Sequence, residues 1–161
     1  MRSVASLTLA LLTFLAALIT VPAVAPAAGK AKHDRVEWSI VRAVNAQRAQ
    51  HGLGAVQPSR GLRRAADRHS RAMLRGDFFA HGAFERRVRR YVSYDSIGET
   101  LAYISSCRGN AGTIVRMWMN SPGHRAILLS RSYGRIGIGR RTGRLGSTRA
   151  CVVTADFASR S

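Results

Sequence analysis

The sequence predicts an α+β layered domain in which helices come first and a β-hairpin comes last. Apolar residues recur at helical spacing over 33–51 and again over 58–76. Near the C-terminus, 133–140 alternates apolar and small residues as a strand does, and 151–157 forms a second predicted strand. Because the helices precede the hairpin instead of alternating with strands, this order favours an α+β domain over a doubly wound sheet.

The N-terminal half is predicted to contain two long helices and one short one. Gly52 follows the first helix, as helix-ending glycines do, and Ser59 is placed to cap the second. In order, the predicted elements are a helix over 33–51, a helix over 58–76, a loop over 78–82 and a very basic helix over 84–91.

In the C-terminal half, Asn110 is predicted to cap a helix that runs to Trp118, and Pro122 and Gly123 then break it. The stretch 97–104 is short and apolar. The remaining predicted elements are a turn or short helix over 124–129, a strand over 133–140, a glycine-containing hairpin loop over 141–147 and a last strand over 151–157.

The N-terminal region has the pattern of a secretory signal peptide. No charged residue occurs between Ser3 and Gly29, and the apolar run ends in small residues instead of a basic stop-transfer cluster. The alternative is an uncleaved membrane anchor, since the run approaches the roughly 20 residues of a membrane span. We therefore predict a signal peptide over 1–28, a short linker over 29–35 and one domain over 36–159, in a protein that is secreted or associated with the cell envelope.

Two cysteines, Cys107 and Cys151, lie in the part predicted to be exported. Outside the cytoplasm such a pair tends to oxidise, so we predict a disulfide that stabilises the fold by roughly 2–4 kcal/mol. The alternative is two buried thiols that do not meet.

The chain is strongly basic, with a formal net charge of +18, and all but two of its 26 basic residues are arginine. Such a charge predicts adhesion to anionic cell-envelope polymers or lipids at low salt. The alternative is that arginine simply replaces lysine on the surface, where it keeps the protein soluble and binds no particular partner. No nucleic-acid-binding motif accompanies the arginines, so no specific nucleic-acid partner is expected.

Five short segments occur in an order that carries more information than any one of them. They are Asp77–His81, Gly98–Ala102, Trp118–Arg125, Ile136–Gly139 and Thr154–Phe157. This ordered set resembles the CAP superfamily (cysteine-rich secretory proteins, antigen 5, pathogenesis-related proteins; the SCP domain) in its short bacterial form. The resemblance covers nearly all of the predicted domain and implies a three-layer α-β-α sandwich around a mainly antiparallel sheet.

The resemblance also implies a central cleft in which two histidines can hold a divalent metal. Carried onto this sequence, the cleft residues are His81, Glu99 and His124, with Ser121 beside them. Neutral imidazole is a good ligand for zinc-like metals, and two imidazoles leave positions open for water or a ligand. Glu99 would orient one histidine ring or accept a proton from a bound water. The competing interpretation is that these side chains only cap loops and helices.

The sequence departs from the family at Ser121, where many eukaryotic members have a second glutamate. This change weakens any carry-over of proteolytic activity. A Ser–His–acid arrangement of Ser121, His124 and Glu99 has no nucleophile elbow around the serine. His33, His51 and His69 are expected to be structural or solvent-exposed. Aromatic residues expected in the core or the cleft wall are Trp38, Phe78, Phe79, Trp118 and Tyr133.

These observations lead to three functional hypotheses. The first is a monomeric binding module, not an enzyme, whose cleft holds a small, lipid-like or envelope ligand and can also hold zinc or another divalent metal. The second is a metal-dependent, peptidase-like hydrolase with Glu99 as base. The third is a cationic envelope-adhesion or defence protein in which the arginines do the binding.

Overall fold

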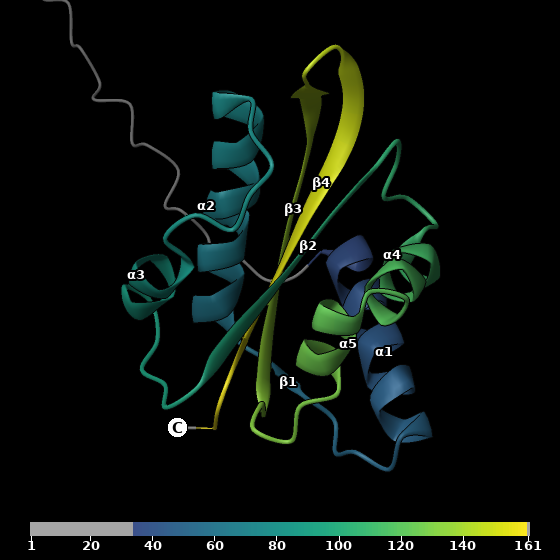
Figure 1. Ribbon diagram of the computed structural model, residues 1–161, viewed down its shortest axis with the longest axis vertical. Helices are drawn as coiled ribbons and strands as arrows, with labels where there is room; N and C mark the ends of the chain where they lie inside the picture. Colours follow the sequence, from purple (N-terminus) through teal and green to yellow (C-terminus); the bar gives the residue numbers. More distant parts are fainter. Residues whose placement is uncertain (1–33, 161) are drawn as a thin grey trace, which may run out of the picture.

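A four-stranded sheet lies between two layers of helices in the computed structural model, which describes residues 34–160 (Figure 1). Helices α2 and α3 cover one face of the sheet, and α1, α4 and α5 cover the other. The helices are α1 (Arg35–Gln50), α2 (Arg60–Gly76), α3 (Phe84–Arg89), α4 (Ala111–Met119) and α5 (Pro122–Leu128), and the strands are β1 (Gln57–Pro58), β2 (Ile97–Ile104), β3 (Arg135–Leu145) and β4 (Thr148–Ala158). The predicted three-layer α+β fold is confirmed.

The sheet has the order β1-β3-β4-β2, so β2 lies at one edge. Its three long strands pair in antiparallel fashion, as predicted, whereas the two-residue strand β1 pairs in parallel with β3 and makes the sheet mixed. The sequence analysis missed β1, because two residues show no periodicity. In the β2–β4 pairing, Glu99 lies directly opposite Asp156.

The helix ends show where local sequence signals succeed and where they fail. Ser59 accepts a hydrogen bond from the Leu62 amide and caps α2, as predicted. Asn110 occupies the cap position of α4 but makes no capping bond, since its side-chain amide donates to the Ser106 carbonyl instead. Helix α5 begins at Pro122 rather than at residue 124, because proline suits the first turn of a helix.

The predicted hairpin loop over 141–147 is wrong. Paired strands continue through this segment as far as Leu145 and Thr148, which leaves a two-residue turn at Gly146 and Ser147. Gly143, taken as a loop residue, lies in the ladder against Leu74 of α2. The strand continues here because 141–145 pairs residue by residue with Thr148–Val152 and because Gly143 packs against α2.

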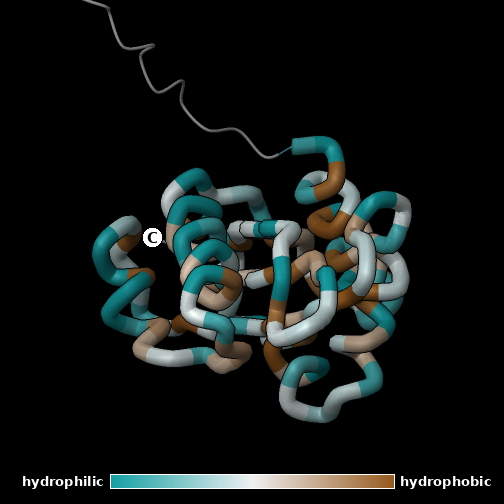
Figure 2. The backbone as a smooth tube through the Cα atoms, turned by 90° about the horizontal axis from the view of Figure 1, so that it is seen from above, coloured by the Kyte–Doolittle hydropathy of each residue, from teal (hydrophilic) through white to brown (hydrophobic). Residues whose placement is uncertain are grey.

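Hydrophobic residues fill the space on both sides of the sheet. The larger cluster lies between the sheet and the layer of α1, α4 and α5, and it includes Trp118, whose indole nitrogen donates to the Leu101 carbonyl at 2.9 Å. Smaller clusters lie under α2. Figure 2 shows mostly hydrophilic positions along the outer turns of α2 and α3. Trp38, Phe78 and Phe79 are exposed, which corrects the expectation that they pack in the core or the cleft wall.

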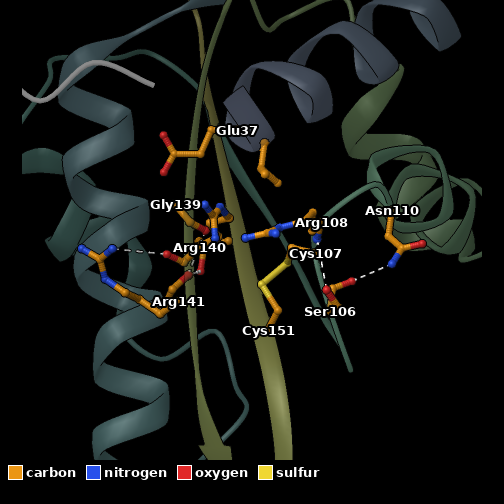
Figure 3. Close-up of a disulfide and its surroundings, with 12 residues drawn as sticks. Glu37, Ser106, Cys107, Arg108, Asn110, Gly139, Arg140, Arg141 and Cys151 are labelled. Atoms are coloured by element: carbon orange, nitrogen blue, oxygen red, sulfur yellow. Dashed lines mark hydrogen bonds between the residues drawn. A yellow bond between two sulfur atoms is a disulfide. The ribbon is translucent and has the colours of Figure 1, made fainter. Parts of the chain in front are cut away.

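A disulfide joins Cys107 to Cys151, as predicted (Figure 3). Both cysteines are buried, and the bond ties the loop between β2 and α4 to the middle strand β4. The predicted signal peptide over 1–28 and most of the predicted linker lie outside the described residues. Between residues 34 and 160, no helix combines the length and apolar character that a bilayer crossing requires.

Helix α2 packs unusually close to the sheet, and two glycines of β3 allow it. A Cβ atom added at Gly139 would lie 2.1 Å from the Asp67 backbone nitrogen, and one at Gly137 would lie 2.1 Å from that of Arg63. In the same contact, the Ser70 hydroxyl donates to the Gly139 carbonyl at 3.0 Å. The pattern Gly-Ile-Gly in β3 is therefore required by the approach of a helix backbone.

Gly139→Ala is expected to destabilise the protein by about 1–3 kcal/mol, because α2 must move away from the sheet to accommodate the new methyl group. Gly54→Ala is the matched control, since no atom lies within 4 Å of a Cβ at that position. Its free energy of unfolding should stay within about 0.5 kcal/mol of the wild type. Urea unfolding of both variants measures the difference, and an equal effect at the two positions would contradict the close-packing explanation.

Candidate functional site

The four residues predicted to form a cleft line one hollow of about 440 Å³. His81 comes from the loop between α2 and α3, Glu99 from the edge strand β2, Ser121 from the start of α5 and His124 from within α5. They meet because β2 lies at the sheet edge, with the helical layers on either side of it. The remaining lining residues are Phe84, Ile97, Gly98, Gly123, Ile127 and Tyr133.

The floor of this cleft has no room for a side chain at Gly98. A Cβ there would lie 2.6 Å from the Tyr133 hydroxyl oxygen and 3.0 Å from a methyl carbon of Ile127. The Tyr133 hydroxyl in turn donates to the Ile97 carbonyl at 2.9 Å. Successive strand residues point to opposite faces of a sheet, so Gly98 faces Tyr133 and Ile127 whereas the Glu99 side chain points to the other face. Both residues still line the cleft, because β2 is the edge strand.

Glu99 is almost completely buried and holds His81 in place. Its Oε1 lies 2.8 Å from His81 Nδ1, and the exposed fractions of the two side chains are 1% and 51%. Its Oε2 accepts a hydrogen bond from the Arg87 guanidinium. Since the paired carboxylate accepts, His81 Nδ1 carries the proton, and the lone pair of the ring is on Nε2.

The two predicted metal-binding histidines lie near each other across the cleft. The centroids of the His81 and His124 rings are 6.4 Å apart, and their planes are tilted by 57°. Burial, with a smaller contribution from His81, lowers the pKa of His124 below its usual value, which favours the neutral ring that binds metals. No hydrogen bond joins Ser121 to His124 among the described residues, so a Ser–His–acid triad is not assembled.

Arg87 of α3 is shared by two buried carboxyl groups. It donates to Glu99 and, at 3.0 Å, to Oδ1 of Asp156, which is fully buried on β4. Burial raises the pKa of Glu99, and burial together with the neighbouring Glu99 charge raises the pKa of Asp156 well above its usual value. One guanidinium therefore faces two carboxyl groups, an imbalance that favours a proton shared by the pair.

His69 of α2 completes this buried cluster as a neutral group. Its Nε2 donates to the Ala80 carbonyl at 2.9 Å, which anchors the loop that carries His81. Burial, reinforced by the nearby Arg87 charge, lowers the pKa of His69 to about 4. Its approach to Glu99, 3.9 Å, is therefore not an ion pair at neutral pH. The expectation that His69 is structural agrees with this role.

Sequence reasoning found the cleft residues but missed the groups beneath them. Asp156 lies in a segment that the sequence analysis singled out, yet only the strand register places it opposite Glu99. Arg87 is one of four arginines in the basic stretch 86–90, and nothing local distinguishes it from its neighbours. The one signal available in the sequence was general: a carboxylate that becomes buried needs a positively charged or hydrogen-bonding partner, so some basic residue had to contact Glu99.

The donors in this cleft fit a metal site with two histidine ligands and offer no third side chain from residues 34–160 as a ligand. Glu99 uses both oxygens on His81 and Arg87, so it orients a ligand instead of serving as one. Within the described part of the chain, no three His, Cys, Asp or Glu side chains gather in a way that would hold a metal. A metal in this cleft would have two imidazole nitrogens and open positions for water or a ligand.

The sequence of this chain matches a known protein family and two curated bacterial proteins. The family model described as the cysteine-rich secretory protein family, CAP, matches residues 41–157. Among curated proteins, the uncharacterized membrane protein YlbC of Bacillus subtilis (strain 168) is 31% identical over 109 residues, which cover 64% of this chain and 31% of YlbC. YkwD of the same organism is 29% identical over 109 residues, or 64% of this chain and 41% of YkwD. The match thus spans less than half of each relative.

Solved structures show the same fold at low identity. An extracellular protein containing an SCP domain from Bacillus anthracis str. Ames superposes with a TM-score of 0.64 at 23% identity, covering 78% of this chain and 40% of that one. An outer surface protein from Borrelia burgdorferi gives a TM-score of 0.66 at 17% identity, covering 81% and 97% of the two chains.

Proposed function

The chain belongs to the cysteine-rich secretory protein (CAP) family, and from this premise we propose that it is an exported binding protein whose cleft takes a small or lipid-like envelope ligand. The arrangement of His81 and His124 across an otherwise largely apolar cleft carries the proposal. Hollows of this size, lined by apolar side chains with a few convergent polar groups, are typical ligand sites. We further propose that the two histidines hold zinc or another divalent metal.

An envelope location is part of the same proposal. Among the proteins that this chain resembles are one named as extracellular, one as an outer surface protein and one as a membrane protein. The charge of +18 supports attraction to anionic polymers or lipids outside the cell. The protein is proposed to act there as a monomer without a specific nucleic-acid partner.

Zinc titration by calorimetry tests the metal-binding part of the proposal. The purified exported protein, without a histidine tag, is expected to bind zinc at micromolar or lower concentration, and His81→Ala and His124→Ala are each expected to abolish binding. Glu99→Gln should weaken it by about tenfold, because His81 then loses its orienting carboxylate. His51→Ala is the control, since His51 lies outside the cleft and contacts Gln47 and Arg125. Binding that survives both cleft variants would contradict a shared metal site.

A second candidate is the hydrolase of the sequence analysis, and the His81–Glu99 hydrogen bond is the observation in its favour. A carboxylate that accepts the second N–H of a metal-binding histidine fixes the ring and raises its basicity, and a metal held in this way would supply an activated water for hydrolysis. Because Glu99 is 1% exposed with both oxygens engaged, it would act through His81 rather than directly on water. Turnover of a peptide or envelope substrate that is lost in Glu99→Gln, with zinc still bound, would support the hydrolase over the binding module.

A further inference from the structure

A second hollow, separate from the histidine cleft, is lined by arginines. It has a volume of about 260 Å³ and lies between α2 and α3. Arg68 comes from α2, and Arg86 and Arg90 lie one turn apart on the segment formed by α3 and its C-cap. The other lining residues are His69, Phe78, Gly82, Ala83 and Arg87. We call this the arginine hollow.

The three outer arginines of the arginine hollow lack counter-charges. Arg68, Arg86 and Arg90 form no ion pair or side-chain hydrogen bond with any residue from 34 to 160. Like charges four residues apart on a helix repel each other, and Arg68 adds a third positive charge. The arginines that do pair with carboxylates are Arg63, Arg71, Arg87, Arg140 and Arg141. An external anion would relieve the repulsion in the arginine hollow.

Phe78 connects the arginine hollow to an aromatic one. It also lines a hollow of about 440 Å³ that contains Phe79 and Tyr103. Phe78 and Phe79 are each 39% exposed and Tyr103 is 52% exposed, and the rings of Phe79 and Tyr103 meet edge to face at 4.9 Å. Arginines that accept an anion thus lie beside exposed aromatic rings that accept an apolar group.

Arginines beside exposed aromatic rings match the two parts of a membrane surface, its anionic head groups and its apolar acyl chains. Guanidinium groups hydrogen-bond phosphate oxygens in a forked geometry, tyrosine favours the boundary between head groups and acyl chains, and phenylalanine inserts its apolar ring there. We propose that the arginine hollow binds the phosphate head group of an anionic lipid while Phe78, Phe79 and Tyr103 enter the membrane interface. The inference rests on the envelope association of the proposed function, and it is independent of the metal in the histidine cleft.

Vesicle co-sedimentation with paired variants tests the site. Phosphatidylcholine vesicles with and without phosphatidylglycerol are incubated with the wild type and with two double variants of equal charge. Arg86→Gln with Arg90→Gln removes two arginines of the hollow. Arg42→Gln with Arg116→Gln removes two exposed arginines on α1 and α4, which lie on the other face of the sheet.

Binding should require phosphatidylglycerol, and the variant of the hollow should bind about thirtyfold more weakly than the control variant, because each of its two arginines contributes about 1 kcal/mol near an anionic surface. Equal losses in the two double variants would overturn the proposal, because diffuse charge would then account for the binding. His81→Ala should bind vesicles like the wild type, so failure of the metal proposal and failure of this one are distinguishable.

A second comparison separates lipid from free phosphate. Phe79→Ser should weaken vesicle binding several-fold and leave the affinity for inorganic phosphate, measured by calorimetry, unchanged. Binding of inorganic phosphate that depends on Arg86 and Arg90, without any binding to the anionic vesicles, would overturn the membrane source.

Discussion

Arg87→Leu is expected to destabilise the protein by about 3–5 kcal/mol near neutral pH, the cost of leaving buried charge without its partner. Arg87 is the cation that contacts both Glu99 and Asp156, whose side chains are 1% and 0% exposed. Without it, the folded protein must either hold two buried carboxylates side by side or bind extra protons that the unfolded chain does not bind.

The destabilisation should shrink as the pH falls. Burial already raises the pKa of Glu99 and of Asp156, and loss of Arg87 raises both further. Groups whose folded pKa lies above the unfolded one stabilise the fold below the unfolded pKa, and this contribution is lost as the pH rises through the folded pKa. The deficit of Arg87→Leu relative to the wild type should therefore be larger near pH 7 than near pH 5.

Urea unfolding at the two pH values measures this deficit, with two further variants as controls. Arg86→Leu removes an adjacent, exposed arginine and should change the free energy of unfolding by less than about 0.5 kcal/mol. Adding Asp156→Asn to Arg87→Leu removes one of the two buried acids and should recover part of the loss. A deficit that is equal at both pH values would contradict the electrostatic explanation and indicate lost packing instead.

Replacing both cysteines with serine is expected to destabilise the fold by about 2–4 kcal/mol. The bond between Cys107 and Cys151 closes a loop with a sequence separation of 44 residues, and the unfolded chain gains the corresponding freedom when it is removed. The same loop contains α4, α5 and all of β3, so the bond restrains the elements that shape one side of the cleft.

Thermal unfolding of the double variant and of the wild type, with and without reducing agent, measures the contribution of the bond. Reduction should lower the midpoint of the wild type toward that of the variant and leave the variant unchanged. If reduction changes neither protein, the cysteines are paired in too few molecules to stabilise the fold.

Local sequence predicted the helices of this protein well. The apolar stripe and the Ser59 cap of α2 are confirmed by its observed bounds, Arg60–Gly76, because both signals act within a few residues. The long arms of the hairpin were not predicted. Glycine and arginine over 141–147 have the composition of a loop, but 141–145 forms a strand because Thr148–Val152 pairs with it.

The candidate site also has a part that the sequence predicted and a part that only the tertiary structure shows. The ordered motifs identify His81, Glu99, Ser121 and His124, and the structure brings these four residues to one cleft at the edge of the sheet. The pairing of Glu99 with Asp156, and the choice of one arginine among four neighbours as their shared cation, depend on strand register and on how α3 packs.

The sequence by itself determined the family, the helical segments, the two cysteines and the side chains of the cleft, since each is carried by residue types at short spacing. Only the tertiary structure decided which charges are buried together, which remain unpaired on α2 and α3, and how near a helix comes to Gly137 and Gly139. These properties arise between segments far apart in the chain, where burial changes the free energy of a charge and a backbone contact sets the space at a residue.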